Sequence, residues 1–388
     1  MSPQLKSVEK AGHDAVSKQG FPNEIGVDDF FNGPKMLKKA FAELIDVPDF
    51  NNTAIIPSAS YGLANAANNV KLEAGDEIII VDAQFPSNVY AWQKVAAQKK
   101  ATIKVIATPK NLTGKGKAWN KNILDAINKK TAVVSLGPIH WADGTIFDLR
   151  AIREKSKLYN AALIIDGSQF IGAAPFSVKE IKPDAVISVG YKWLMGPYGL
   201  GMAYYSDDFN DGEPLENNWI NRYKSEDFTQ LVNYNPGYQP KAGRYNMGEC
   251  SNFILVPMLT ESIKQLLKWQ PKHFQNYCNS ISKKGISNLQ ELGCSIEDDD
   301  FRSKHLFGVY LPKHIDLQNL KTKFQQESIH VSYRGDAIRV SPSVYNSETD
   351  TITNSDGTPP GLIPGKLYLN KVQHFNPANH VNNGSVRR

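Results

Sequence analysis

Short apolar runs alternate with segments of helical composition along residues 53–206, and this alternation constrains the fold more than any other feature. The expected strands cover residues 53–57, 77–81, 101–107, 132–136, 162–165 and 185–189. Residues 60–70, 86–99 and 147–159 read as helices between them. Such alternation predicts an α/β fold, in which a mostly parallel sheet carries helices on both faces. Ligands bind such sheets at the carboxyl ends of the strands.

The pattern changes after residue 206. Residues 207–252 are rich in Asn, Tyr, Gly and Pro and predict a long irregular segment, which in an enzyme is often functional. Residues 255–292 read as two helices with a break at 269–271, and residues 294–341 mix strands with one helix. We therefore predict three parts: a large domain at 20–252, a small α+β domain at 1–19 and 253–346, and a loosely ordered tail at 347–388.

Composition narrows the classes of function. The 388-residue chain has a net charge of +5 without a block of Lys and Arg, which argues against nucleic-acid binding. No stretch approaches the roughly 20 apolar residues of a membrane span, and the polar start has no signal core. Cys250, Cys278 and Cys294 lack metal-ligand spacing, so we predict no metal site and a cytoplasmic location.

Two expected strands end in residues that belong together chemically. The run 162–165 is followed by Asp166, and the run 185–189 by a glycine-rich turn that contains Lys192. Pyridoxal phosphate uses both types, because a lysine forms a Schiff base with its aldehyde and a carboxylate keeps its ring nitrogen protonated. Asp166 alone could cap a helix, and Lys192 alone could be a surface residue. The apolar flanks of Lys192 favour the functional interpretation, since a lysine in such surroundings loses its charge more easily.

Four further positions fit such a site, and each has a structural alternative. Residues 58–60 join a strand to a helix, where small residues and the helix dipole suit a phosphate but would equally cap the helix. Phe85 could stack on a ring or fill the core. Trp141 ends another run and could line the substrate pocket. Arg339 stands between apolar residues of an expected strand, which is unusual unless its guanidinium has a partner such as a carboxylate.

The string from 164 to 202, with Asp166, Gln169 and Lys192, resembles the class V aminotransferase family, which includes cysteine desulfurases, kynureninase-like enzymes and isopenicillin N epimerase-like enzymes. The resemblance covers about residues 1–346. It implies a fold-type I architecture with a seven-stranded, mostly parallel sheet and a smaller α+β domain. It also implies that Asp166 pairs with the ring nitrogen, that Gln169 contacts the phenolic oxygen and that Lys192 carries the Schiff base.

The same resemblance assigns further contacts. Ala59 and Ser60 match the turn that holds the cofactor phosphate in the family. Arg339 matches the arginine that binds the substrate α-carboxylate. In the loop 243–252, Arg244 or Asn252 is the better candidate for a phosphate or substrate contact. The loop 243–252 resembles the one that reaches across a homodimer to the partner's cofactor.

The chain also departs from the family pattern. Desulfurase relatives have Ser-Gly-His before the lysine, where this chain has Val189, Gly190 and Tyr191. A valine cannot bond a phosphate, so either Ser188 or the partner chain is predicted to supply that contact. Tyr191 replaces the histidine and can still donate a hydrogen bond. The segment 330–336 contains no cysteine, which argues against a persulfide-forming desulfurase.

The sequence therefore predicts a pyridoxal-phosphate enzyme acting on an amino acid. Transamination, with a 2-oxo acid as second substrate, is the leading reaction. Isopenicillin N epimerase-like epimerisation and a cysteine-independent C–S or β-lyase reaction are the alternatives. A protein that binds the cofactor without turnover is a further alternative, since the start is short and the tail is atypical relative to the family.

Overall fold

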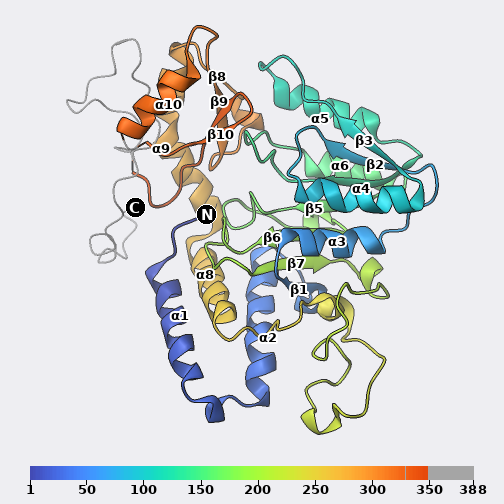
Figure 1. The fold of residues 1–388 in the computed structure, drawn as a ribbon. Helices are drawn as coiled ribbons and strands as arrows, with labels where there is room; N and C mark the ends of the chain where they lie inside the picture. Colours follow the sequence, from blue (N-terminus) through green and yellow to red (C-terminus); the bar gives the residue numbers. More distant parts are fainter. Residues whose placement is uncertain (328, 348–388) are drawn as a thin grey trace. The chain divides into compact units, whose positions relative to one another are not determined.

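The computed structural model describes residues 1–327 and 329–347, which form two compact units (Figure 1). The first unit contains residues 1–110, 115–141 and 146–272. The second contains residues 111–114 and 142–145 together with the described residues from 273 onward. The sequence placed residues 1–19 and 253–272 in the small domain, whereas here they pack in the unit that contains the large sheet. The predicted tail at 347–388 lies outside the described residues except for Ser347.

The first unit is built on a seven-stranded sheet of order β1-β7-β6-β5-β4-β2-β3. Strands β2 to β6 run parallel, and β7 runs antiparallel to its neighbours β1 and β6. The strands are β1 Thr53–Ile56, β2 Glu77–Val81, β3 Thr102–Ile106, β4 Thr131–Leu136, β5 Ala162–Asp166, β6 Ala185–Val189 and β7 Gly201–Tyr205. The predicted α/β fold with a mostly parallel sheet is confirmed, and each of the six predicted runs is a strand.

Helices α3 (Ala59–Asn69) and α4 (Ser87–Lys99) cover one face of this sheet. Side chains of β2, β5 and β6 form a common core there with Leu63 of α3 and Trp92 of α4. Helix α3 lies very close to the sheet, because a Cβ on Gly62 would stand only 2.8 Å from Ile56 and 3.0 Å from Ile187. Helix α6 (Leu149–Lys157) packs on β5 outside that core.

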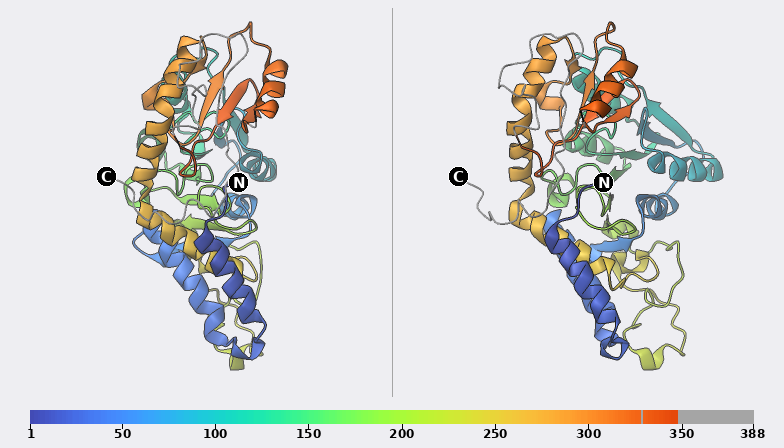
Figure 2. Two further views of the ribbon diagram at one scale, coloured as in Figure 1. Left: turned by 90° about the vertical axis from the view of Figure 1, so that its left-hand side faces the viewer. Right: turned by 60° about the vertical axis from the view of Figure 1, so that its left-hand side comes forward.

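The other helices of this unit are α1 Lys6–Gln19, α2 Val27–Leu44, α5 Lys115–Ala126, α7 Val178–Ile181 and α8 Leu255–Trp269. Both α1 and α2 lie alongside α8 (Figures 1 and 2). Short 3₁₀ helices are η1 Pro22–Glu24, η2 Phe50–Asn52, η3 Asp207–Phe209, η4 Phe228–Gln230 and η5 Lys241–Tyr245. Within residues 206–252 the only helices are the 3₁₀ turns η3, η4 and η5, so the predicted irregular segment at 207–252 is confirmed.

The second unit contains an antiparallel sheet of order β10-β11-β9-β8. Its elements are α9 Pro271–Glu291, β8 Ser295–Ile296, η6 Asp299–Phe301, β9 Phe307–Tyr310, α10 Leu317–Gln326, β10 Ser332–Arg334 and β11 Ala337–Val340. One face of the sheet is apolar and packs against Ile286 of α9 and Phe324 of α10. The predicted mixture of strands and one helix over 294–341 is confirmed.

None of the helices in the described part of the chain is both long enough and apolar enough to cross a membrane.

Candidate active site

Asp166 is the last residue of β5, at the carboxyl end of the parallel strands. Side chains alternate along a strand, so Asp166 shares a face with Ile164, which packs in the core under α3 and α4. Its Oδ1 accepts a hydrogen bond from the N–H of Ser168 at 3.0 Å. This bond fixes the half-buried carboxylate at the end of the sheet.

Lys192 lies in the turn between β6 and β7, and backbone hydrogen bonds close this turn. The Gly190 N–H donates to the Leu200 carbonyl at 2.8 Å, and the Gly196 N–H donates to the Gly190 carbonyl at 2.9 Å. The Met195 N–H donates to the Lys192 carbonyl at 3.1 Å. Hydrogen bonds within the turn therefore fix the backbone on both sides of Lys192.

Ser2, near the N-terminus, also forms hydrogen bonds to the backbone of the lysine turn. Its N–H donates to the Tyr191 carbonyl at 3.1 Å, and its hydroxyl donates to the Lys192 carbonyl at 2.6 Å. Nothing in the sequence around Ser2 pointed to this contact, because it joins residues 190 positions apart.

Aromatic rings surround the amine of Lys192. Its Nζ lies 5.0 Å from the centroid of the Phe85 ring and 5.9 Å from that of Tyr191. The Phe85 and Trp141 rings meet edge to face at 5.4 Å, and the Trp141 indole donates to the Ala83 carbonyl at 2.6 Å. Phe85 and Tyr191 therefore lie beside Lys192, and Trp141 contacts Phe85. Their predicted roles toward cofactor and substrate stay predictions.

Tyr191 links this aromatic group to Asp166. Its ring lies 4.6 Å from that of the exposed Tyr198, at an interplanar angle of 41°. Burial raises the pKa of the Tyr191 hydroxyl, and the neighbouring Tyr198 and Asp166 raise it further. The carboxylate of Asp166 therefore acts electrostatically on Tyr191, the residue before Lys192.

Gln169 lies in the turn that follows Asp166, and Trp193 holds its side chain. The Trp193 indole Nε1–H donates to the Gln169 Oε1 at 3.1 Å. The sequence treated Trp193 only as an apolar flank of the lysine, so this contact was missed. Its position directly after Lys192 was the available signal.

The N-terminus of α3 supplies hydroxyl and N–H groups. Ser58 caps the helix, because its Oγ accepts from the Tyr61 N–H at 3.2 Å. The hydroxyls of Ser58 and Ser60 lie 2.9 Å apart. The N–H groups of the first turn, at Ala59 and Ser60, belong to the set that a helix leaves without intrahelical partners. Small side chains and the helix dipole make this end suitable for a phosphate.

The predicted contact of Ser188 is not supported by its position. Ile187 and Val189 pack in the core with α3, so Ser188 between them faces the other side of the sheet. Its hydroxyl is buried and has no hydrogen-bond partner among the described residues. The predicted phosphate contact of Ser188 stays a prediction, and the alternation of β6 argues against it.

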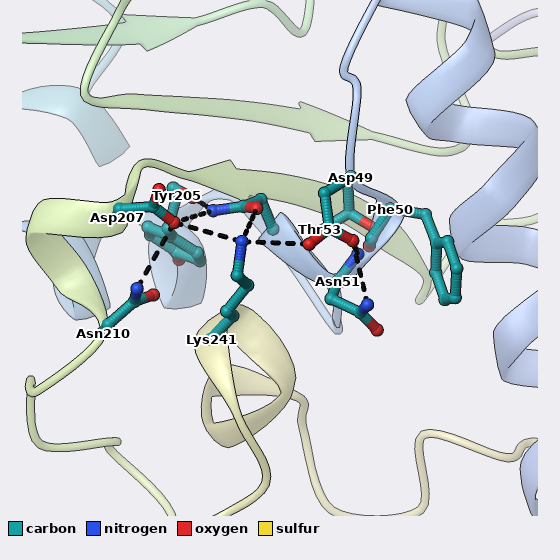
Figure 3. Close-up of polar contacts among 9 residues, drawn as sticks. Asp49, Phe50, Asn51, Thr53, Tyr205, Asp207, Asn210 and Lys241 are labelled. Atoms are coloured by element: carbon teal, nitrogen blue, oxygen red, sulfur yellow. Dashed lines mark hydrogen bonds and ion pairs between the residues drawn. The ribbon is translucent and has the colours of Figure 1, made fainter.

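Arg244 lies in η5, which a polar cluster fixes beside β1. The Nζ of Lys241 lies 2.9 Å from Asp49, 3.0 Å from the Asn52 amide oxygen and 3.3 Å from Asp207 (Figure 3). The Arg244 guanidinium donates to the Gly212 carbonyl at 3.0 Å. The Arg244 side chain is thus bonded to another part of the segment 206–252. Its predicted contact with phosphate or substrate stays a prediction.

Arg339 lies on β11 of the second unit, so its place in the Lys192 site stays a prediction. Burial lowers the pKa of its guanidinium to about 10, with the neighbouring Arg334 adding to the effect. Its Nη2 lies 3.5 Å from the Ser332 hydroxyl. Asp143, also in this unit, accepts from the Tyr310 hydroxyl at 2.7 Å and from the Thr145 N–H at 3.1 Å. Asp143 therefore serves the structure of its turn.

The residues at this edge of the sheet offer a partner for each functional group of pyridoxal phosphate. The α3 terminus suits its phosphate and the Asp166 carboxylate its ring nitrogen. The Gln169 amide suits its phenolic oxygen, the Phe85 ring one face of its pyridine, and the Lys192 amine its aldehyde. The donor set thus fits this cofactor.

Comparisons with known proteins agree with this chemistry. The profile of the Aminotransferase class-V family matches residues 30–349. An uncharacterized aminotransferase of Schizosaccharomyces pombe, C777.03c, is 21% identical over 81% of this chain and 78% of its own length. Another of Bacillus subtilis, YcbU, is 22% identical over 81% of this chain and 80% of its own. The solved cystine C-S lyase C-DES, in complex with its product cysteine persulfide, has a TM-score of 0.78 at 18% identity, covering 89% of this chain and 92% of that one.

Proposed function

Because the chain belongs to the class-V aminotransferase family and is a pyridoxal-phosphate-dependent enzyme of fold type I, we propose that it transaminates an amino acid at Lys192. The observation that supports this most directly is the position of the Lys192 amine. It lies 5.0 Å from the Phe85 ring, at the strand ends where Asp166 also lies. A 2-oxo acid is the second substrate in this proposal.

The cofactor, when bound, draws electrons from the bond that breaks at the substrate α-carbon. Asp166, fixed by the Ser168 N–H, keeps the ring nitrogen protonated, which that electron flow requires. Phe85 covers one face of the ring and excludes water from it. Lys192 holds the aldehyde before substrate arrives and then carries a proton at the α-carbon.

The remaining contacts extend this proposal. Ala59 and Ser60 bind the phosphate at the α3 terminus, and Trp141 lines the substrate pocket beside Phe85. Arg339 binds the α-carboxylate, because a guanidinium can hold a carboxylate through two parallel hydrogen bonds. A homodimer, in which the loop 243–252 reaches the partner's site, completes the proposal.

The three cysteines argue against a persulfide route. Cys250, Cys278 and Cys294 are buried free thiols. Burial raises the pKa of Cys250 and Cys278 to about 12 and that of Cys294 to about 11. The thiolate is the nucleophile, so thiols with such pKa values are inert near neutral pH.

A cysteine-independent lyase is the second candidate. The observation that favours it is the similarity, at a TM-score of 0.78, to the solved cystine C-S lyase C-DES. The two reactions need the same Lys192 and Asp166, so they differ in what is released from the substrate. Their products therefore decide between them.

The test is to add single L-amino acids to the cofactor-loaded protein without any 2-oxo acid. Transamination predicts stoichiometric pyridoxamine phosphate and the matching 2-oxo acid. Release of sulfide, or of pyruvate from cysteine or cystine, would favour the lyase instead. Lys192→Ala should abolish the visible band of lysine-bound cofactor, whereas Lys179→Ala, at an exposed lysine of α7, should keep it. A wild-type protein that shows no such band with added cofactor would refute the proposed function.

A further inference from the structure

Trp193 and Gln169 are joined by a hydrogen bond whose direction is chemically fixed. The indole Nε1–H of Trp193 lies 3.1 Å from the Oε1 of Gln169. An indole nitrogen can only donate, so the atom that faces it must be the amide oxygen of Gln169. The two ends of a glutamine amide are otherwise hard to tell apart. Here the partner settles the orientation.

Both partners are held in place by the surrounding chain. Trp193 is 7% exposed and belongs to the hydrogen-bonded turn between β6 and β7. The turn after Asp166 comes close to it at Gly172, where a Cβ would stand only 2.3 Å from the Trp193 carbonyl oxygen. Gly172 has a φ of +98°, a conformation that glycine adopts freely. The two turns are therefore packed against one another, and the indole has little freedom to leave the amide.

The fixed orientation determines which end of the Gln169 amide, the oxygen or the NH₂ group, points away from Trp193. With Oε1 bound to the indole, the NH₂ group is the end of the amide directed away from Trp193. An NH₂ group donates hydrogen bonds, which stabilise a negatively charged oxygen. The reversed amide would present its carbonyl oxygen and repel the same charge.

We propose that Trp193 is a positioning residue, which keeps the Gln169 amide turned so that its NH₂ group donates to the phenolic oxygen of the cofactor. This role rests on the proposed function, because it needs pyridoxal phosphate at Lys192. Trp193 then acts on the cofactor through Gln169, and it tunes how readily the cofactor gives up the proton shared by its phenolic oxygen and its linking nitrogen.

The decisive variant is Trp193→Phe, which keeps an aromatic ring and deletes the N–H. The measurement is the pH midpoint of the visible band of lysine-bound cofactor. A donor to the phenolic oxygen stabilises its deprotonated form, so losing the fixed donor raises the midpoint, by about half a unit to one unit for one hydrogen bond. Gln169→Glu should raise it further, because the carboxylate still accepts from Trp193 but places a negative charge toward the cofactor.

Trp92→Phe is the matched control. Trp92 is fully buried, and its indole N–H also donates to a side-chain amide oxygen, that of Asn88, at 2.9 Å; the Ser135 hydroxyl shares this donor at 2.9 Å. The same deletion is therefore made at an equivalent bond in the core under α4. Trp92→Phe should leave the midpoint of the band unchanged. An equal shift in both variants would overturn the proposal, because it would show a general effect of losing a buried indole.

A second measurement needs no cofactor. In the cofactor-free protein, Gln169→Leu should move the Trp193 indole ¹H–¹⁵N resonance upfield and leave that of Trp92 in place. An unmoved Trp193 resonance would overturn the hydrogen bond itself. An unshifted Trp193→Phe midpoint would overturn the role of that bond. Loss of the band in the wild-type protein would instead refute the proposed function, while the indole resonance would still report on the hydrogen bond.

Discussion

The turn that carries Lys192 and the segment 206–252 both consist largely of irregular chain, yet they are held in different ways. Residues 190–200 form a short turn whose backbone groups bond to one another, as between Gly190 and Leu200. Trp193, Leu194 and Met195 within it are buried. Backbone hydrogen bonds and close packing therefore fix the lysine.

The segment 206–252 depends more on side-chain contacts between distant parts of the sequence. Lys241 bonds to Asp49 and Asp207, which lie far from it and from one another along the chain (Figure 3). The same segment exposes large apolar side chains, with Val232 78% and Tyr234 95% accessible. Its backbone is fixed at scattered polar points, and much of its surface is uncovered in the single chain.

This difference explains why the lysine turn can be predicted from the sequence and the polar cluster around Lys241 cannot. A buried turn needs particular residues at consecutive positions, so its glycines and apolar residues stand together in the string 190–200. A polar cluster needs only one residue from each of several segments. The effects of substitutions in the two regions should therefore differ, both in the unfolding free energy that is lost and in the property that changes.

The largest effect is expected from Gly172→Ala, at the contact between the lysine turn and the turn after Asp166. The new Cβ would overlap the Trp193 carbonyl, 2.3 Å away, at a backbone φ of +98°. Strain and overpacking together should cost roughly 3 kcal/mol of unfolding free energy, measured by urea denaturation. Gly75→Ala is the matched control, since its φ is +93° but no atom lies within 4 Å. Equal losses would show that the two turns are not packed tightly.

Lys241→Met should have a smaller effect, because the cluster it removes is partly exposed. The side chains of Lys241 and Asp49 are 31% and 40% accessible. We expect a loss of about 1 kcal/mol and faster hydrogen exchange over residues 241–247. Lys224→Met is the control, because Lys224 is exposed in the same segment and shares the left-handed backbone, with a φ of +61° against +55°. A loss of the same size in both variants would argue against the cluster.

The same cluster predicts that its contribution to the unfolding free energy decreases at both low and high pH. Burial alone would raise the pKa of Asp49, but hydrogen bonds from Lys241 and Asn51 outweigh it and lower the value below 3.8. The hydrogen bond to Asp49 raises the pKa of Lys241 above 10.5. The ion pair stabilises the fold fully above pH 3.8, and the contribution of Asp49 is lost as the pH falls below that value toward the lowered pKa. The contribution of Lys241 is fully present below pH 10.5 and is lost as the pH rises above that value toward the raised pKa. The difference in stability between wild type and Lys241→Met should therefore be largest between these limits and shrink on either side.

Much of the sheet could be predicted because its signals are local. The six apolar runs became strands, and the break at 269–271 separates α8 from α9. Strand β7 was missed, since Gly201–Tyr205 follows a glycine-rich turn without a helix between it and β6. Helix α5 was missed because its polar string, Lys115–Ala126, has few apolar residues to show a helical period.

The site was predictable where the chemistry demanded a residue type. Phe85 and Tyr191 lie beside Lys192 and Trp141 contacts Phe85, because each of the three follows a strand whose end lies at the same edge. The predicted phosphate contact of Ser188 rested on its place in the sequence, whereas the alternation of side chains along β6 decides which way Ser188 faces. Ser2 could not have been found, because no local pattern announces a contact with a residue 190 positions away.

Ser2→Ala tests that long-range contact. The variant deletes the hydroxyl that donates to the Lys192 carbonyl at 2.6 Å and keeps the backbone bond to Tyr191. We expect a loss of at most about 1 kcal/mol and faster hydrogen exchange over residues 1–5. Ser2→Thr keeps a hydroxyl and should behave as the wild type. Identical exchange in all three proteins would mean that the hydroxyl does not hold the turn in solution.

The smallest effect on the single chain is expected from Tyr234→Ser in the exposed part of the segment 206–252. The Tyr234 side chain is 95% accessible, whereas that of Tyr245 in the same segment is fully buried. Exposed positions without a special contact change stability by no more than about 0.5 kcal/mol. Thermal unfolding at several protein concentrations, together with the mass in solution, checks this. A loss that grows as the protein is diluted, or a lower mass, would show that Tyr234 is covered in an assembly, because only then does the mutation act through association.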